Sequence, residues 1–321
     1  MQEAKIKFDH VTKIFETRSQ TITAVKDYSM EIQAGEFISI LGPSGCGKST
    51  LIRMLDGIID TTEGGILIDG VKVNHKGKKM PSSVLRKLGF IFQQPNMLPW
   101  YTVRQNVALP LRVFGLKGPE WDNRVEELLE MVGLKEYADA HPNEISGGML
   151  QRAGVIRAMV HDPEILLMDE PFGALDEMTR EQMNMELLEI WEKTGKTIIF
   201  ITHNLGVVAR YAEKVQVVYA GRLVEGGTAE DIFQRTCHPY TKGLIRAVPR
   251  LDMPQDQELV GIEGSPPDLR KLSPHLCAFS DRCRYATVQC RSQRPELEEV
   301  APGHVAACFH ARELRKEVSP R

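Results

Sequence analysis

The spacing of apolar residues along the chain changes between two periods, and this change predicts which segments are strands and which are helices. Residues 5–11 alternate between apolar and polar with a period of two, as a half-buried strand does. Residues 165–168 form a short continuous apolar run, which is typical of a strand buried on both faces of a parallel sheet. The same patterns predict strands at residues 24–32, 37–41, 64–70, 88–92, 197–201 and 214–219.

Helical spacing of apolar residues lies between these strands. Residues 103–111 and 121–132 have it, so residues 96–159 are predicted to form a mostly helical insertion. Two further helices are predicted at residues 178–193 and 205–211. Strands that alternate with helices imply an α/β fold, with a mostly parallel sheet covered by helices on both faces.

Composition restricts the class of protein. The chain has 321 residues, enough for two domains or for one large domain with an appendage. Hydrophobic residues make up 42% and charged residues 26%, as is usual for a soluble globular protein. The net charge of −3 gives no strong attraction to nucleic acid, so we expect no nucleic-acid partner. No window approaches the roughly 18 apolar residues of a membrane span, and the first ten residues lack the apolar run of a signal peptide. We therefore expect a cytosolic protein.

The composition changes beyond Val248, where prolines become frequent. Such a change predicts a boundary between a main domain at residues 1–248 and a loop-rich extension at residues 249–321. The prolines that mark the change are Pro249, Pro254, Pro266, Pro267 and Pro274.

A glycine-rich segment between the strand at 37–41 and a following helix has the pattern of a phosphate-binding loop, because that context turns the residue spacing into a phosphate site. Backbone N–H groups and the helix N-terminus would hold phosphate oxygens. Lys48 would neutralise the β- and γ-phosphates and Ser49 would hold Mg²⁺, whereas the alternative is an ordinary glycine-rich turn. The segment reads Gly42-Pro43-Ser44-Gly45-Cys46-Gly47-Lys48-Ser49-Thr50.

Two further groups of residues fit the same chemistry. Asp169 closes the buried run at 165–168, where a carboxylate can orient Mg²⁺, and Glu170 could accept the proton of an attacking water. Ser146, Gly147 and Gly148 open a helix whose N-terminus is suited to phosphate. Two solvated carboxylates and a simple helix cap are the alternatives. A second phosphate-ready helix in one chain suggests that it serves the nucleotide of a second subunit.

The order of these motifs resembles that of the ATP-binding subunits of ABC transporters over residues 1–235. The loop at 42–50 is similar to the Walker A motif, residues 165–169 to Walker B with Glu170 as the catalytic carboxylate, and residues 146–148 to the signature motif. The remaining family motifs fall on Phe15 for adenine stacking, Gln93 for the Q-loop, Gly173-Ala174-Leu175-Asp176 for the D-loop and Thr202-His203 for the H-loop. Ile145, Met149 and Asn204 depart from the common residues at their positions.

The resemblance implies a P-loop NTPase cassette with a RecA-like, mostly parallel sheet core, an antiparallel β subdomain and a helical subdomain. It also implies a sandwich of two ATPase subunits, as a homodimer or heterodimer, in which residues 146–148 of one subunit complete the ATP site of the other. Asp176 would contribute to nucleotide binding, and His203 would contact the γ-phosphate beside Lys48.

The implied chemistry is ATP hydrolysis coupled to transport. Ser49, Gln93 and Asp169 would surround Mg²⁺, and Glu170 would polarise the attacking water. The helical insertion, with Gln93 at its hinge, would press on transmembrane permease subunits at the cytoplasmic face of the cell membrane. An extracytoplasmic solute-binding protein would deliver the solute to those permeases.

Two parts of the chain resemble different importer groups. Residues 94–100, 168–176 and 188–195 are similar to nitrate, sulfonate and taurine importer ATPases. Residues 219–222, 238–241 and 264–267 are similar to oligopeptide and dipeptide importer ATPases. Because the C-terminal extension is the rarer feature, we expect uptake of a peptide or related nutrient, with the nitrate or sulfonate group as the alternative. A soluble ABC ATPase and a redox-regulated sensor are the alternatives from other classes.

Four of the six cysteines lie in the extension, which is too poor in apolar residues for a large core of its own and suggests a metal staple. Zinc and an iron–sulfur cluster both fit four thiolates, although the C-x-x-C pairs typical of zinc ribbons are missing. The resemblance to dipeptide importer ATPases implies a four-iron four-sulfur cluster, and four free thiols are the alternative. The residues are Cys277, Cys283, Cys290 and Cys308, and Cys237 with His238 forms a weaker metal-binding pair.

Overall fold

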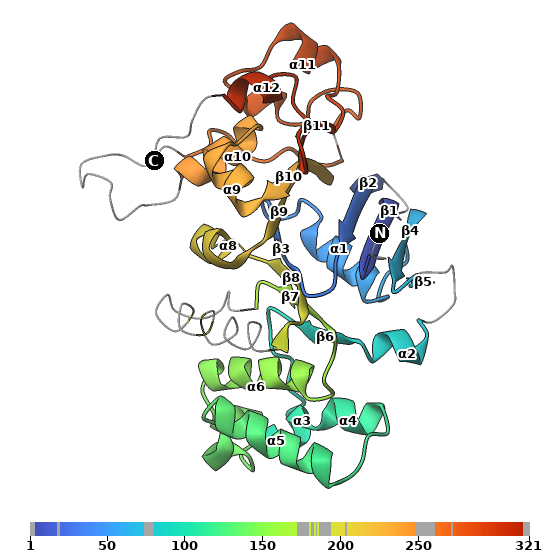
Figure 1. Ribbon diagram of the computed structural model, residues 1–321, viewed down its shortest axis with the longest axis vertical. Coiled ribbons are helices and arrows are strands. Elements are labelled where there is room, and N and C mark those ends of the chain that lie inside the picture. The colour runs from blue at the N-terminus through green and yellow to red at the C-terminus, as the bar shows by residue number, and fades with distance from the viewer. Residues whose placement is uncertain are drawn as a thin grey trace, which may run out of the picture.

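The computed structural model describes residues 4–17, 20–73, 80–171, 180, 183, 185, 194–202, 204–247, 261–270 and 272–316. Two β-sheets and a group of helices make up this part of the chain (Figure 1). The smaller sheet is antiparallel with the order β2-β1-β4-β5. Its strands are β1 (Ile6–Glu16), β2 (Thr21–Ile32), β4 (Glu63–Ile68) and β5 (Val71–Lys72).

The larger sheet has the order β11-β12-β10-β9-β3-β8-β7-β6. Its five strands from β9 to β6 are parallel, which confirms the predicted α/β fold, and β10, β12 and β11 continue it in antiparallel pairing. The strands are β3 (Phe37–Leu41), β6 (Leu88–Ile91), β7 (Ile165–Asp169), β8 (Thr197–Ile201), β9 (Lys214–Tyr219), β10 (Arg222–Thr228), β11 (Glu298–Ala301) and β12 (His304–Ala306). The sequence pattern did not predict β10, in which Gly226 and Gly227 interrupt the apolar run.

The helical subdomain consists of α3 to α6, and a capping box of Thr102 and Gln105 begins it. Residues 178–193, predicted as a helix, lie almost entirely outside the described residues. The described helices are α1 (Lys48–Leu55), α2 (Ser82–Leu85), α3 (Val103–Val107), α4 (Leu109–Val113), α5 (Pro119–Met131), α6 (Gly147–Met159), α8 (Leu205–Tyr211), α9 (Ala229–Gln234), α10 (Pro239–Arg246), α11 (Val288–Ser292) and α12 (Ala311–Leu314). The short 3₁₀ turns are η1 (Lys135–Tyr137), η2 (Pro142–Glu144) and η3 (Ser280–Arg282).

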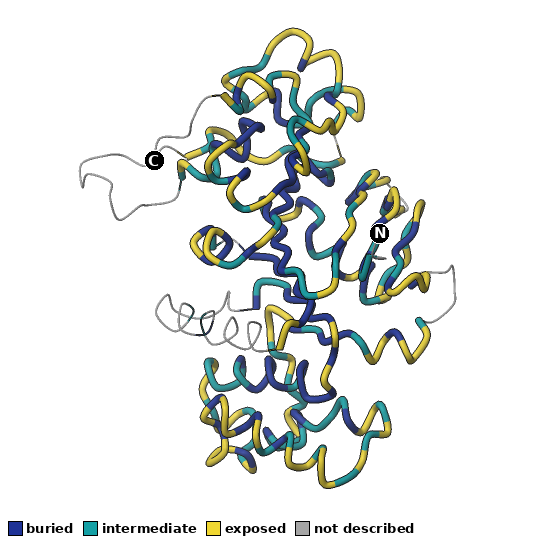
Figure 2. Tube along the Cα trace, in the orientation of Figure 1, coloured by how far each residue is buried: buried dark blue, intermediate teal, exposed yellow. Residues whose placement is uncertain are grey.

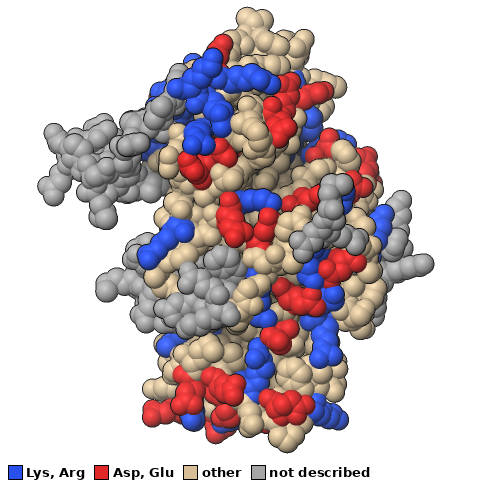
Figure 3. Space-filling model, viewed as in Figure 1, with Lys and Arg blue, Asp and Glu red and all other residues tan. Residues whose placement is uncertain are grey.

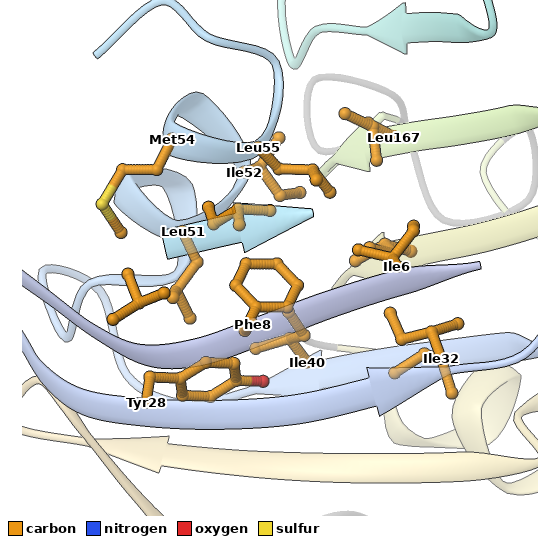
Figure 4. Packing of buried hydrophobic residues seen from close by; sticks show 14 of the residues in the cluster. Ile6, Phe8, Tyr28, Ile32, Ile40, Leu51, Ile52, Met54, Leu55 and Leu167 are labelled. Atoms are coloured by element: carbon orange, nitrogen blue, oxygen red, sulfur yellow. The ribbon is translucent and has the colours of Figure 1, made fainter. Parts of the chain in front are cut away.

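The main hydrophobic core fixes α1 between the two sheets. Leu51 and Ile52 of α1 pack with Phe8 of β1 and Ile40 of β3, and Figure 4 shows these side chains gathered between the helix and the strands. The rings of Phe8 and Tyr28 meet edge to face, with centroids 5.4 Å apart. Each such side chain contributes roughly 1.5–3 kcal/mol on full burial. Because α1 follows the glycine-rich loop, this packing also holds that loop in place.

The C-terminal extension continues the main sheet. Its strand β12 pairs with β10, so that Glu225 lies opposite Ala306 and Gly226 opposite Val305. Phe279 of the extension belongs to a buried hydrophobic cluster that also contains residues of the larger sheet. Figure 2 shows buried chain running through the central strands and on into the extension. The extension is therefore attached by backbone pairing and by apolar contact.

The residue at the C-terminus of α1 gives the free energy of unfolding a testable pH dependence. Asp56 ends α1, and burial raises the pKa of its carboxyl to about 7, although the Ile58 N–H donates to it at 2.8 Å. The folded chain therefore keeps this proton to a higher pH than the unfolded chain, and the free energy of unfolding should fall as the pH rises from about 4 to about 7.

Asp56→Asn should remove that slope and be more stable than the wild type above about pH 7, because no charge is then buried. Urea unfolding at a series of pH values measures the effect. Asp60→Asn, at an exposed position four residues away, is the control and should keep the wild-type slope. An equal slope in the wild type and in Asp56→Asn would contradict the prediction.

Candidate nucleotide site

The glycine-rich loop at residues 42–50 lies between the end of β3 and the start of α1. Its backbone approaches two neighbouring strands so closely that only glycine fits. Gly42 has φ of 154°, and a Cβ there would overlap the carbonyl oxygen of Val218. Gly47 has φ of 105°, and a Cβ there would overlap the carbonyl oxygen of Ala24. The loop is therefore held against β9 and β2 and opens toward the N-terminus of α1.

Lys48 is the first residue of α1 and is only 4% exposed. Its Nζ donates hydrogen bonds to the carbonyl oxygens of Gly42 at 2.8 Å and Pro43 at 3.0 Å. The ammonium group is thus directed into the loop that the backbone encloses. A phosphate in the loop would meet this charge together with the free N–H groups of the helix N-terminus.

Ser49 and Asp169 lie 120 positions apart in the sequence, and the fold joins them. The Ser49 hydroxyl donates to Asp169 Oδ1 at 3.1 Å. Burial raises the pKa of Asp169, and the hydrogen bond from Ser49 counteracts this shift. A hydroxyl and a carboxylate oxygen side by side are the hard donors that Mg²⁺ prefers, so this pair fits a magnesium ion.

Glu170 follows Asp169 at the carboxyl end of β7 and has φ of 48°, an uncommon value for a residue other than glycine. Its N–H donates to the carbonyl oxygen of Ile201 on β8 at 2.9 Å. The negative charge of Glu170 contributes to the raised pKa of Asp169, so the two carboxylates lie near each other. A strained backbone held by the neighbouring strand is typical of a functional position.

Two other predicted residues lie at strand ends. Gln93 is exposed and follows β6, and its carbonyl oxygen accepts a bond of 3.5 Å from Gln151 Nε2. Phe15 lies near the end of β1 and is 38% exposed, with Lys13 Nζ 5.0 Å from the centre of its ring. An exposed aromatic face is available for stacking on a base.

The second helix N-terminus is also exposed. Ser146 caps α6, and its hydroxyl accepts from the N–H of Met149 at 3.3 Å. Gly147 is exposed, and a Cβ there would meet no atom within 4 Å. Ser146 and Gly147 are therefore accessible at the surface, whereas Gly148 is partly buried.

Gln151, to which the sequence analysis assigned no role, joins three of these segments. It is 3% exposed in α6, and its side-chain amide donates to the carbonyl oxygen of Pro171 and to that of Gln93. Arg157, also in α6, donates to the carbonyl oxygens of Pro95 and Asn96. The three polar side chains of α6, Gln151, Arg152 and Arg157, in a helix otherwise rich in small and apolar residues were the available signal.

Two predicted residues, Asp176 and His203, lie outside the described residues. The residues on either side of His203 are described. Thr202 is buried, and its hydroxyl accepts from the N–H of Asn204 at 3.0 Å. The side chain of Asn204 caps α8 by accepting from the N–H groups of Gly206 and Val207. Asn204 departs from the residue common at this position in the family, and the structure gives it a role as the N-cap of α8.

The four cysteines of the extension lie near one another as free thiols. Burial raises the pKa of Cys308 to about 12, and the three neighbouring thiols add to the shift. The N–H of Cys277 donates to the carbonyl oxygen of Cys290 at 3.0 Å. Among the described residues, no three of the sulfur atoms of Cys277, Cys283, Cys290 and Cys308 lie within 4.8 Å of one another.

Cys237 lies in a buried group with Glu225 and His304, whose possible ligand atoms are all within 4.8 Å, and Cys308 packs against the hydrophobic cluster that contains Cys237. Glu225 accepts from the N–H groups of Cys237 at 2.6 Å and His238 at 3.0 Å, and its Oε1 is 3.0 Å from His304 Nε2. The side chain of His238 instead caps α10 by accepting from the N–H of Tyr240. The fold therefore pairs Cys237 with His304 and Glu225, not with the neighbouring His238.

These features together define a P-loop nucleotide hydrolase of the ABC type. The family ABC transporter matches residues 25–173, and the family oligopeptide/dipeptide transporter, C-terminal region, matches residues 224–290. The dipeptide transport ATP-binding protein DppF of Haemophilus influenzae is 34% identical over 308 residues, covering 95% of this chain and 94% of that protein.

Two other proteins support the same assignment. The methionine import ATP-binding protein MetN of Carboxydothermus hydrogenoformans is 40% identical over 235 residues, which cover 73% of this chain and 70% of that protein. The dimeric structure of the ATP-binding cassette MJ0796 in a post-hydrolysis state bound to ADP and Pi has a TM-score of 0.63 and 34% identity, and covers 70% of this chain and 98% of that one. The chain belongs to the ATP-binding subunits of ABC transporters, of the importer type, and couples ATP hydrolysis to transport.

Within the part of the chain that the structure describes, none of the helices combines the length and the hydrophobicity needed to cross a bilayer. The family works with transmembrane permeases and requires ATP and Mg²⁺.

The contacts of Lys48 predict two effects of Lys48→Ala. Nucleotide affinity should fall because the phosphate-facing charge is lost. The nucleotide-free protein should also lose roughly 1–3 kcal/mol of unfolding free energy, because the carbonyl groups of Gly42 and Pro43 lose their donor.

Fluorescent-nucleotide titration and urea unfolding without nucleotide measure the two effects. Ser44→Ala changes an exposed residue of the same loop and should leave the unfolding free energy unchanged. Wild-type stability in Lys48→Ala would show that the two carbonyl bonds contribute nothing to the folded loop.

Proposed function

We propose that this chain energises the import of oligopeptides or dipeptides. The observation that carries the proposal is the extension, whose β12 pairs with β10 of the cassette and which lies partly in the region that matches the oligopeptide/dipeptide transporter family. Two relatives of nearly full length support it. DppF is one, and the probable peptide ABC transporter ATP-binding protein y4tS of Sinorhizobium fredii, 35% identical over 96% of this chain and 90% of that protein, is the other.

Uptake measurements in the host separate this solute class from the alternative. Loss of the gene should abolish uptake of labelled dipeptides and leave uptake of taurine and nitrate unchanged. The opposite result would assign the chain to the nitrate, sulfonate and taurine group, which its residues 94–100 resemble. Unchanged uptake of every solute would favour a soluble ABC ATPase or a redox-regulated sensor.

We propose the following roles in the ATP site. Lys48 and the N–H groups of residues 42–50 bind the phosphates, and Phe15 stacks on the adenine. Ser49, Asp169 and Gln93 hold Mg²⁺, which when bound neutralises charge on the phosphates. Glu170 accepts the proton of the attacking water, because its backbone is held at the end of β7 beside Asp169. His203 and Asp176 complete the site.

We also propose that two such chains, or this chain and a homologous ATPase, form the hydrolytic unit. The N-terminus of α6 supports this proposal, since Ser146 and Gly147 are exposed and the N-terminus of a helix favours a phosphate group. Gln151 and Arg157 link α6 to the segment that contains Gln93. If Gln93 moves when nucleotide binds or is hydrolysed, α6 and the helical subdomain would move with it. This movement would press the subdomain on permease subunits at the cytoplasmic face of the membrane.

Glu170→Gln should retain ATP binding and lose about 10²- to 10⁴-fold in turnover, because the amide cannot accept the proton. The variant should also accumulate as an ATP-bound dimer. Phosphate release and mass measurement with and without ATP provide the readouts. Glu31→Gln, an exposed position on β2 that pairs with Lys7, is the control and should have wild-type turnover. Near-normal turnover in Glu170→Gln would remove this residue from the role of general base.

We further propose that the four cysteines of the extension hold a four-iron four-sulfur cluster. Thiolates are soft ligands that suit iron–sulfur clusters and zinc. Four thiolates fit both kinds of site by number. The resemblance of the extension to that of dipeptide importer ATPases favours the cluster over a single zinc ion.

Protein purified without oxygen should contain iron and sulfide and absorb visible light, and Cys283→Ser should lose most of this iron together with the protease resistance of the extension. Cys46→Ser removes a thiol outside the group and should leave the iron content unchanged. Zinc without iron would replace the cluster by a zinc site. Protein with neither metal, and with an unchanged proteolysis pattern in Cys283→Ser, would leave four ordinary thiols.

A further inference from the structure

A second cavity lies between the small antiparallel sheet and the C-terminal extension. Its volume is about 630 Å³, which is in the range of small-molecule binding sites. Its walls come from β1 and β2 on one side, from the start of β10, and from extension residues on both sides of η3 and α11 (Figure 1). None of the residues 42–50 lines it, so the cavity is separate from the nucleotide site.

Two arginines face this cavity from different segments. Arg222 begins β10, and Arg294 lies between α11 and β11. Within the described part of the chain, no hydrogen bond or ion pair joins either guanidinium group to another residue. Burial, with a smaller contribution from the positive charge of Arg294, lowers the pKa of Arg222 to about 10. Two like charges therefore lie close together in a partly desolvated space.

The other charged residues of the cavity compensate these arginines only in part. Lys26 pairs with Glu63 at 3.0 Å, and Arg270 pairs with Asp268. Asp27 favours the charged form of Arg222, but its Oδ1 is also 2.7 Å from His10 Nδ1. The exposed Glu296 is the other carboxylate that lines the cavity.

On the face drawn in Figure 3, positive and negative side chains are interspersed over much of the surface. A pair of arginines held near each other and only partly compensated by carboxylates is a site that an oxyanion would stabilise, since planar guanidinium groups match carboxylate and phosphoryl oxygens. Leu223, Leu272 and Leu297 add apolar wall to the same cavity. The lining thus combines two guanidinium groups with apolar side chains.

We propose that this cavity binds a small organic anion, with a carboxylate or phosphoryl group held between Arg222 and Arg294 and an apolar part against the leucines. The proposal does not depend on which solute the transporter imports. Gly221, the residue before Arg222, donates its N–H to the carbonyl oxygen of Cys46 in the phosphate loop and accepts from the N–H of Lys26. The anion site therefore lies next to the backbone that supports the nucleotide site.

The test uses the full-length protein saturated with ADP and Mg²⁺, so that the phosphate loop is filled. Succinate and inorganic phosphate are the two probes, one for each kind of oxyanion. Either probe should raise the thermal midpoint of the wild type in a saturable manner. Arg222→Gln and Arg294→Gln should each weaken this binding about tenfold or more, because a charge-assisted hydrogen bond is lost.

Arg291→Gln is the matched control, since Arg291 lies on α11 outside the cavity, with a long ion pair to Asp281 at 3.8 Å. It should retain wild-type binding, and it also exposes any general stabilisation by salt, which would be equal in all variants. Response to succinate alone assigns a carboxylate ligand, and response to phosphate alone a phosphoryl ligand. No saturable response to either, or an equal response in all three variants, would overturn the proposal.

A second measurement separates binding from a structural role. Without added anion, Arg294→Gln should be as stable as the wild type or more stable, because it removes repulsion between two guanidinium groups. A loss of stability in that variant would mean that Arg294 holds the extension to the cassette, and would also overturn the proposal.

Discussion

The close approach of the phosphate loop to β2 and β9 is the constraint on which the rest of the structure depends. At Gly42 and Gly47 a single added carbon would overlap a carbonyl oxygen of a neighbouring strand. The loop can therefore close only when both sheets are in place around α1. The same closure directs Lys48 inward and places Ser49 within hydrogen-bond distance of Asp169. Nucleotide chemistry and the packing of the two sheets are thus parts of one arrangement.

A second set of contacts ties the helical subdomain to this arrangement. The apolar residues of α3 to α6 form a core of their own, which lets the subdomain pack as a unit. Its helix α6 also packs against the larger sheet, since Val155 and Met159 lie in one buried cluster with Leu166 of β7. Gln151 and Arg157 of α6 add hydrogen bonds to backbone carbonyl groups of neighbouring segments. The helical subdomain is therefore joined to the sheet by apolar packing as well as by hydrogen bonds.

The extension is attached in another way. Backbone pairing of β12 with β10 is reinforced by the buried Glu225, which accepts two N–H groups at the start of α10 and lies 3.0 Å from His304 of β12. A buried carboxylate with several partners stabilises only that arrangement, because removing any partner would leave a charge unsatisfied. The cysteine group and the second cavity both depend on the position that this contact gives to the extension.

The sequence by itself determined the local elements and the chemistry of the nucleotide site. Strands such as 37–41 and 165–169 follow from short apolar runs, and the phosphate loop follows from glycine and lysine spacing, because both signals are local. The role of residues 146–148 at a partner's nucleotide stays a prediction from the order of the motifs along the chain. The strand β10 was missed, since Gly226 and Gly227 weaken the apolar pattern that neighbouring strands compensate.

Only the tertiary structure decided which distant residues meet. The Ser49–Asp169 hydrogen bond, the links from Gln151, and the choice of His304 over His238 as the neighbour of Cys237 join segments far apart in sequence. The Arg222 and Arg294 pair likewise exists only because the extension folds back onto the cassette. Periodicity reports which face of an element is buried, whereas strand order and packing decide what lies opposite that face.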